Sequence, residues 1–288
     1  MATKKLTCAF NLCALKGRDK VTEHQLATAR GLGFFAEFPT EGVAVVIGGS
    51  GGLGKVVCER LAQCGCDVAL TYRSNARKAG EVAAAIEGLG RRADTQPLDL
   101  TDPEAVERYY GDIVSRFGRI HTLVVATGAD IRMDYLFNIG VDEWRTVIMN
   151  DAIGFFNAVK LVLPHMRSGG GGSIVALSSA AMARHSPMDI LSTGPKGSIE
   201  AVVRAVAREE GRFNIRANSV GIGAMDTGLM DRVWGHLSPK AAEAMRKGPP
   251  LGRIGKADEV ADAIVFLASS RSGYTTGQRL VLDGGFST

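Results

Sequence analysis

A glycine-rich heptapeptide is the first place where residue types and spacing indicate binding chemistry. Residues 48–54 read Gly-Gly-Ser-Gly-Gly-Leu-Gly, between an apolar β-branched run at 42–47 and an amphipathic stretch at 53–64. Glycine permits positive φ and a close backbone approach to an anion. The first turn of a helix adds free N–H groups and the positive end of a dipole. The order strand, turn, helix therefore predicts a diphosphate-binding turn. Its expected contacts are Gly48, Ser50, Gly52, Leu53 and Gly54.

The second apolar run, 67–72, is followed by Arg73 and Ser74. A ribose with a free 2′-hydroxyl calls for an Asp or Glu at this place. A guanidinium and a hydroxyl suit a 2′-phosphate instead, and an ordinary solvated arginine is the alternative interpretation. We therefore expect NADP(H) rather than NAD(H) as the cofactor, with Asp99 and Leu100 beside the adenine.

The elements that must position these residues alternate along the chain. Strand-like runs cover 42–47, 67–72, 94–98, 122–126, 173–177, 215–220 and 279–282. Helix-like stretches cover 53–64, 75–89, 103–117, 142–166, 197–210 and 257–268. Strict alternation implies right-handed crossovers and a parallel sheet. We predict an α/β fold of the Rossmann type, a doubly wound parallel sheet of about seven strands with helices on both faces.

Residues 42–288 together resemble the short-chain dehydrogenase/reductase superfamily. Gly48-x-x-x-Gly52-x-Gly54 is similar to its cofactor turn, and 282–285, Leu-Asp-Gly-Gly, is similar to its typical ending. The resemblance implies an active-site Asn, Ser and Lys at Asn150, Ser179 and Lys196, respectively. It also implies cofactor contacts from Lys196, Thr127, Gly128 and Thr227. The family's Asn-Asn-Ala-Gly stretch reads Val-Ala-Thr-Gly at 125–128, and its Pro-Gly reads Ile-Gly at 222–223.

The largest departure from the family is a missing tyrosine. The family places Tyr thirteen residues after the Ser and four before the Lys, where this chain has Ser192. In the family a Lys lowers the pKa of that Tyr, which gives its proton to the developing alkoxide. A Ser hydroxyl is a far weaker acid, so we expect Ser192 and Ser179 to orient a substrate oxygen. Lys196 would still hold the nicotinamide ribose.

Three other side chains could supply the proton: His185 and Asp189, between Ser179 and Lys196, and Tyr135. His is the natural choice near neutral pH, although an exposed loop His and a packed aromatic are the ordinary interpretations of His185 and Tyr135. Dienoyl-CoA reductases resemble the chain in having Ser four residues before the Lys. Enoyl-carrier reductases place their Tyr where this chain has Asp189.

Two functions follow from these residues. The first is an NADPH-dependent reductase of a carbonyl, or of a conjugated enone or enoyl group, with an atypical proton donor. The second is a catalytically impaired, cofactor-binding subunit that supports an active paralogue. The intact turn favours cofactor binding in both, and the missing Tyr favours the second.

Composition narrows the partners and the compartment. The net charge of +4 is small and its basic residues are spread out, so we expect no nucleic-acid partner. No apolar run reaches about 18 residues, so we expect no membrane partner. Five cysteines in a chain of 288 residues favour a reducing, cytoplasmic setting. We expect no metal.

Residues 1–40 differ from the rest and form an expected N-terminal extension to a single domain at 41–288. A secretory signal or a transit peptide is the alternative interpretation. Apolar residues on several sides of 142–166 and 197–210, with the family resemblance, imply a homodimer or homotetramer, and a hetero-oligomer is an alternative. The segment 229–251 would cap the pocket. Its apolar residues predict an apolar or aromatic small-molecule substrate; they are Met230, Val233, Trp234, Leu237 and Met245.

Overall fold

A computed structural model describes residues 37–128, 131–227 and 239–288. The chain divides into a unit Met1–Ala36 and a unit Glu37–Thr288. The predicted extension, up to Ala36, lies outside the described residues.

A seven-stranded parallel sheet forms the centre of this unit, in the order β3-β2-β1-β4-β5-β6-β7. The strands are β1 (Val43–Ile47), β2 (Asp67–Tyr72), β3 (Ala93–Pro97), β4 (Ile120–Val125), β5 (Gly172–Ser179), β6 (Ile215–Ile222) and β7 (Arg279–Leu282). Every residue of β1 and β4 is buried, as expected of parallel strands covered on both faces. The predicted fold class is confirmed.

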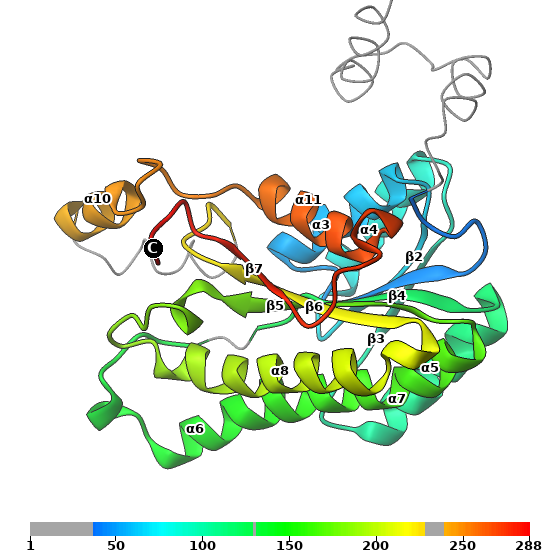
Figure 1. The fold of residues 1–288 in the computed structure, drawn as a ribbon, viewed down its shortest axis with the longest axis horizontal. Helices are drawn as coiled ribbons and strands as arrows, with labels where there is room; N and C mark the ends of the chain where they lie inside the picture. Colours follow the sequence, from blue (N-terminus) through cyan, green and yellow to red (C-terminus); the bar gives the residue numbers. More distant parts are fainter. Residues whose placement is uncertain (1–36, 129–130, 228–238) are drawn as a thin grey trace, which may run out of the picture. The chain divides into compact units, whose positions relative to one another are not determined.

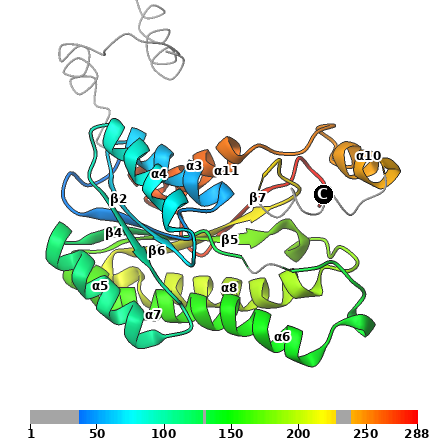
Figure 2. The same ribbon diagram turned by 180° about the vertical axis from the view of Figure 1, so that it is seen from behind.

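Helices cover the sheet in two layers (Figures 1 and 2). One layer holds α3 (Gly52–Gln63), α4 (Ala76–Gly88) and α11 (Ala257–Ala268); the other holds α5 (Pro103–Phe117), α7 (Gly154–Ser168) and α8 (Ile190–Glu209). Each layer closes its own apolar core against the sheet. The short helices α6 (Val141–Val147) and α10 (Pro239–Lys247) lie toward the end where the carboxyl ends of the strands meet the loops.

Two predicted helices differ from the structure. The stretch 142–166 is α6, then a π-helical turn η2 (Ile148–Ile153), then α7. The helix expected at 197–210 begins at Ile190 and runs through Pro195. A proline usually ends or kinks a helix, but here the Asp189 carbonyl accepts the N–H groups of Ser192 and Thr193 and closes the first turn. Both differences fall beside the candidate site.

The continuous helix 141–168 is long and apolar enough, by length and composition alone, to cross a membrane. In this fold Phe155, Val159 and Val162 are buried in the core that α7 shares with α5. One face of this helix thus belongs to the core of the described unit.

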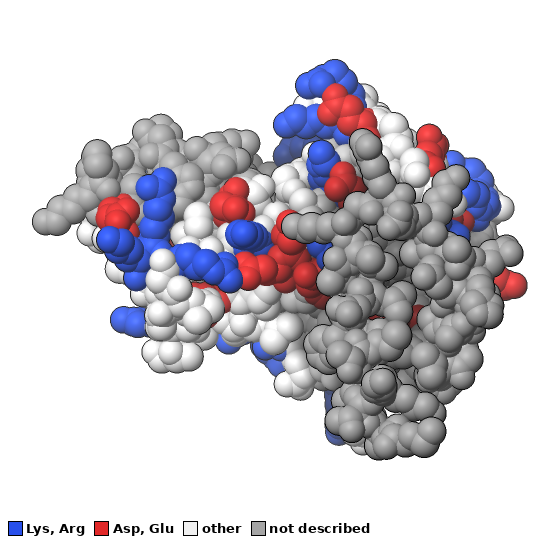
Figure 3. Space-filling model, turned by 90° about the horizontal axis from the view of Figure 1, so that it is seen from above, with Lys and Arg blue, Asp and Glu red and all other residues white. Residues whose placement is uncertain are grey.

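Ion pairs join helices within the layer that holds α3 and α11. Arg60 of α3 contacts Asp258 at 2.8 Å and Asp262 at 2.6 Å, both on α11. Figure 3 shows basic and acidic side chains interspersed on the described part of the face seen from above. The charges on that described surface therefore form mixed clusters rather than one basic patch.

Candidate functional site

The strand order reverses between β1 and β4, where neighbouring crossovers leave on opposite faces. In open parallel sheets ligands bind outside the carboxyl ends of the strands at such a point. The glycine turn follows β1, and Thr127 and Gly128 follow β4, so the topology brings these segments to one crevice.

The glycine turn is closed by its own backbone. Gly48 has φ +78°, and its N–H donates to Thr71 Oγ1 of β2 at 3.2 Å. A Cβ on Gly54 would lie 2.2 Å from the Gly48 carbonyl oxygen, and one on Gly49 would lie 2.6 Å from Leu70 Cβ. No larger residue fits at these two positions without moving the turn.

The start of α3 is open to an anion. Gly51 is the N-cap without a side-chain cap, and the first turn contains no acidic residue. Ser50 and Leu53 are half-buried beside it, and Gly52 is exposed. The N–H groups of this turn and the positive end of the helix dipole therefore face no carboxylate of the same turn. The residues present fit a diphosphate.

The predicted ribose and adenine contacts gather after β2 and β3. Arg73 and Ser74 are exposed, and among the described residues Arg73 forms no ion pair. Hydrogen bonds from the Thr101 N–H and hydroxyl lower the pKa of Asp99, and the charge of Arg73 adds to this effect. Leu100 is buried. This end of the crevice thus presents a guanidinium with a nearby ionised carboxylate.

Thr127 connects the cofactor turn to the predicted active-site lysine. Its methyl group would lie 2.8 Å from a Cβ placed on Gly48. Its carbonyl oxygen accepts a hydrogen bond from Lys196 Nζ at 3.5 Å. Gly128, the next residue, is exposed. The structure therefore brings Lys196, from α8, to the same edge as the glycine turn.

A carboxylate that the sequence did not indicate faces Lys196. Asp151 Oδ2 lies 3.6 Å from Lys196 Nζ, and the two side chains are 7% and 11% exposed. Asn150, the predicted active-site residue, precedes Asp151 in the π-helical turn and is half-buried. The side chain that η2 presents to Lys196 is that of Asp151.

The two predicted serines come from β5 and α8. Ser179 ends β5, is half-buried, and its Oγ accepts a hydrogen bond from Ala181 N at 3.1 Å. Ser192 lies in the first turn of α8 and is half-buried. Two residues on, a Cβ at Gly194 would lie 2.1 Å from the ring of Trp144, which fixes how α6 packs on α8. Both hydroxyls are thus held on regular elements that also position Lys196.

The three candidate proton donors have different surroundings. Asp189 precedes α8 but its side chain does not cap the helix, and burial raises its pKa from 3.8 to about 6, which the charge of His185 partly offsets. His185 is exposed, and Tyr135 is 61% exposed. Among these three side chains, Asp189 is the one whose pKa burial raises toward neutral pH.

Part of the predicted site lies beyond what the structure describes. Thr227 is half-buried after β6, next to Asp226, whose N–H donates to the Gly255 carbonyl at 2.9 Å. Met245 of α10 is half-buried. The other apolar residues of the capping segment, Met230, Val233, Trp234 and Leu237, lie outside the described residues.

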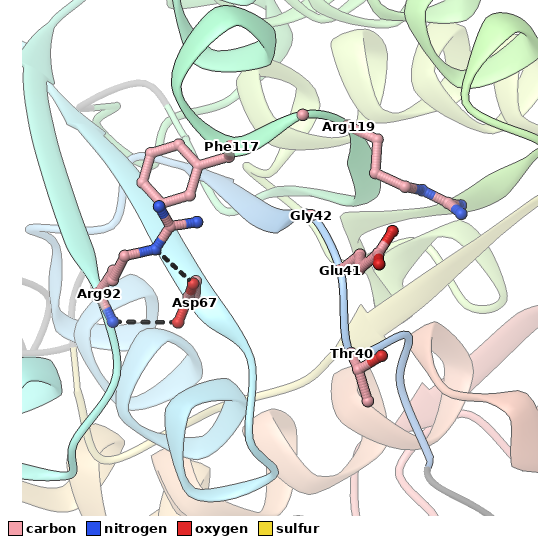
Figure 4. Close-up of a pocket in the computed structure, with 8 residues that line it drawn as sticks. Thr40, Glu41, Gly42, Asp67, Arg92, Phe117 and Arg119 are labelled. Carbon is pink, nitrogen blue, oxygen red and sulfur yellow. Dashed lines mark hydrogen bonds and ion pairs between the residues drawn. The ribbon is translucent and has the colours of Figure 1, made fainter.

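Two cavities lie elsewhere. One, of about 420 Å³, opens at the amino ends of β1 and β2, where the Arg92 guanidinium lies 4.4 Å from the centre of the Phe117 ring and pairs with Asp67 (Figure 4). The other, of about 460 Å³, lies beside Met225, Leu251 and the end of β7. Within the described ranges, no group of three or more His, Cys, Asp or Glu could hold a metal ion.

Known proteins are similar to this chain over most of its length. The family model described as enoyl-(acyl carrier protein) reductase matches residues 48–287. The chain is 33% identical over 243 residues to the 3-oxoacyl-acyl-carrier-protein reductase FabG of Thermotoga maritima, covering 84% of this chain and 96% of that protein. It is 32% identical over 251 residues to an NADP-dependent mannitol dehydrogenase of Hypocrea jecorina, covering 85% and 92%.

Among solved structures, the carveol dehydrogenase of Mycobacterium avium in complex with NAD superposes with a TM-score of 0.80 at 28% identity, covering 85% of this chain and 97% of that one. Model, relatives and structure agree on one family over the region that contains the glycine turn, Ser179 and Lys196. The chain therefore belongs to the family described as enoyl-(acyl carrier protein) reductase, and it is an oxidoreductase of the short-chain dehydrogenase/reductase type.

Proposed function

We propose that the protein is an NADP(H)-dependent reductase of a carbonyl, or of a conjugated enone or enoyl group, that works without a tyrosine acid. The observation that carries this proposal is the position of Thr127. Its side chain packs against the glycine turn while its carbonyl accepts a hydrogen bond from Lys196. A cofactor seated on the turn would therefore extend toward the lysine and the two serines.

The preference for NADP(H) rests on Arg73 and Ser74. An exposed guanidinium without an ion-pair partner among the described residues is available to a 2′-phosphate, to which it would donate charge-assisted hydrogen bonds. Such bonds contribute about 1.5–3 kcal/mol. The neighbouring Arg77 differs because it already pairs with Glu81.

Titration of the purified protein with NADPH and with NADH tests this preference. Arg73→Ala should weaken NADPH binding about 10–100-fold and leave NADH binding almost unchanged. Arg77→Ala, which removes another exposed arginine from the first turn of α4, is the matched control and should alter neither. Equal affinity of the unmodified protein for both nucleotides would refute the choice of NADP(H), and no saturable binding of either would refute the enzymatic proposal.

The reaction needs a hydride at carbon and a proton at oxygen or at the neighbouring carbon. When bound, the reduced nicotinamide supplies the hydride with its electron pair. Ser179 and Ser192 would donate hydrogen bonds to the acceptor oxygen and orient it. Lys196 would hold the ribose through its N–H groups. These roles use the side chains that β5 and α8 bring to the crevice.

We assign the proton to Asp189. Asp189 stands three residues before Ser192, and its side chain does not cap α8, because its backbone carbonyl accepts the first N–H groups of the helix. Burial raises the pKa of its carboxyl to about 6. A carboxylic acid with that pKa is partly protonated near neutral pH and can donate to a developing oxyanion. After donation it would regain its proton from solvent.

Activity measurements test the assignment. NADPH consumption with a panel of ketones, enones, 3-oxoacyl thioesters and enoyl thioesters should identify a substrate class. The panel includes thioesters because the similar FabG of Thermotoga maritima is named a 3-oxoacyl-acyl-carrier-protein reductase. kcat/KM should fall as the pH rises above about 6, as Asp189 loses its proton. Asp189→Asn should lose about 10²–10⁴-fold in rate and the pH dependence with it. His185→Gln should keep the rate at low pH, and its pH profile should move to higher pH, because the charge that lowers the pKa of Asp189 is removed.

The alternative function has its own outcome in these assays. Tight NADPH binding with no turnover across the panel would support a cofactor-binding subunit without chemistry. A full rate and an unchanged pH profile in Asp189→Asn would instead reject Asp189 as the donor and leave the reductase proposal standing.

We also propose that copies of this chain associate through η2 and the start of α7. Phe155 is buried, but Phe156, Ile153 and Met149 are 50%, 40% and 43% exposed. This apolar strip is continuous with the face that the sequence predicted to be left for a partner. Light scattering should give a dimer or tetramer, and Phe156→Glu should reduce its mass toward that of a monomer.

A further inference from the structure

Lys196 forms a buried ion pair with Asp151. A site that used a tyrosine phenol as its acid would need this lysine as an uncompensated cation, to lower the pKa of the phenol. Lys196 Nζ and Asp151 Oδ2 are 3.6 Å apart, and both side chains are almost wholly buried. In such surroundings a carboxylate compensates an ammonium far more strongly than it would at the surface. A lysine paired in this way presents less net charge to its neighbours than an unpaired lysine would.

The π-helical turn is what places the carboxylate there. Ile148–Ile153 interrupts the helix between α6 and α7, and Asp151 and Ala152 are its buried residues. Such turns rotate the residues that follow relative to a regular helix and are frequent at functional sites. Asp151 thus faces α8, which packs against η2.

Other charged groups near Lys196 are few and differently engaged. On α8, Glu200 accepts a hydrogen bond from Ser219 Oγ at 2.8 Å and lies 3.9 Å from Arg204. Asp189 and His185 precede α8, and the charge of His185 lowers the pKa of Asp189. Among the described residues, Asp151 is the ion-pair partner of Lys196.

We propose that Asp151 is a positioning residue that neutralises Lys196, so that the lysine can hydrogen-bond the cofactor ribose without offering a net positive charge to an acid at position 192. The missing tyrosine and the carboxylate would then be two parts of one adaptation. An uncompensated ammonium lowers the pKa of a nearby phenol, whereas a compensated one does so weakly. The role given to Asp151 rests on the proposed reductase function, but the experiment that tests it needs neither substrate nor cofactor.

The test introduces a phenol and reads its ionisation by ultraviolet difference titration, without substrate or cofactor. Ser192→Tyr in the otherwise unmodified chain should give a phenol with a pKa near its usual value of about 10. Ser192→Tyr combined with Asp151→Asn should lower that pKa by about one unit or more. The chain's native tyrosines are subtracted with the parent proteins that carry Ser192.

A matched control separates charge compensation from a general loss of buried carboxylate. Ser192→Tyr combined with Glu200→Gln removes a buried carboxylate of α8, one turn after Lys196. It should leave the phenol pKa within about 0.3 unit of that in Ser192→Tyr alone. An equal pKa in the Asp151→Asn and Glu200→Gln backgrounds would overturn the proposal. Because no substrate is present, this outcome is distinct from a failure of the reductase proposal.

A second arm covers a loss of folding. Removing one member of a buried pair leaves the other charge uncompensated and destabilises the protein strongly. If Asp151→Asn yields no folded protein, Asp151→Asn combined with Lys196→Met should recover folded protein, judged by circular dichroism and a cooperative thermal transition. A paired variant that shows no cooperative thermal transition either would also overturn the proposal.

Discussion

Gly54→Ala is the sharpest perturbation of the cofactor turn, because one methyl group meets backbone rather than a movable side chain. The added Cβ would lie 2.2 Å from the Gly48 carbonyl oxygen and 2.9 Å from both Gly48 C and Gly49 Cα. Real Cβ atoms essentially never come closer than 3.0 Å to such atoms. The turn must therefore move away from α3 by about 1 Å, since no rotamer can relieve the contact.

The displacement predicts two separate losses. Overpacking of this kind costs about 1–3 kcal/mol of stability, which lowers Tm by about 2–10 °C for a domain of this size. Moving the N–H groups that would hold a diphosphate weakens charge-assisted hydrogen bonds of about 1.5–3 kcal/mol. NADPH affinity should therefore fall about 10–100-fold.

Thermal unfolding with and without NADPH measures both effects, together with a fluorescence titration of the nucleotide. Gly111→Ala is the matched control: Gly111 is exposed in the middle of α5, and a Cβ there would meet nothing within 4 Å. It should raise stability by about 0.5–1 kcal/mol and leave NADPH affinity unchanged. Unaltered NADPH affinity in Gly54→Ala would refute the assignment of this turn to the diphosphate.

Three further changes probe the site. Gly194→Ala places a Cβ 2.1 Å from the Trp144 ring and should cost about 1–3 kcal/mol, measured by chemical unfolding. Ser178→Ala removes a buried hydroxyl that has no hydrogen-bond partner among the described residues, so stability should change by less than about 1 kcal/mol or rise, whereas Ser219→Ala should cost about 1–3 kcal/mol. Burial raises the folded-state pKa of Asp189 to about 6, so its contribution to stability is fully present below about pH 4 and is lost as the pH rises through 6. The free energy of unfolding of Asp189→Asn should therefore exceed that of the unmodified protein by about 1–3 kcal/mol at pH 8 and equal it at pH 3.5. Urea unfolding at both pH values measures this difference.

The fold could be predicted because its signals are local and repeated. The strands Asp67–Tyr72 and Arg279–Leu282 begin and end at the residues that the sequence predicted. The helix Pro103–Phe117 begins where Asp102 caps it, its carboxylate accepting the Ala105 N–H at 3.0 Å. Alternation of such elements leaves few topologies. The glycine turn followed from the same logic, because its position between a strand and a helix is visible along the chain.

The partner of Lys196 could not be predicted in that way. Helical periodicity assumes a constant rotation per residue, and the π-helical turn Ile148–Ile153 breaks it just where the buried face matters. The sequence therefore could not distinguish Asn150 from Asp151 as the inward residue. The start of α8 was missed for a related reason: Pro195 indicates a boundary locally, but the Asp189 carbonyl and the packing of Trp144 on Gly194 hold the turn before it.

The two carboxylates beside this site explain each other. Burial is the main cause that raises the pKa of Asp189, and the charge of His185 is what opposes it. A free ammonium on α8 would add a second opposing charge and favour the ionised acid. Asp151, 3.6 Å from Lys196, would weaken that opposing charge if it compensates the lysine as proposed. If Asp151 compensates Lys196 as proposed, the same compensation would make a phenol at position 192 a poor acid and help the half-buried carboxyl of Asp189 to stay partly protonated near neutral pH.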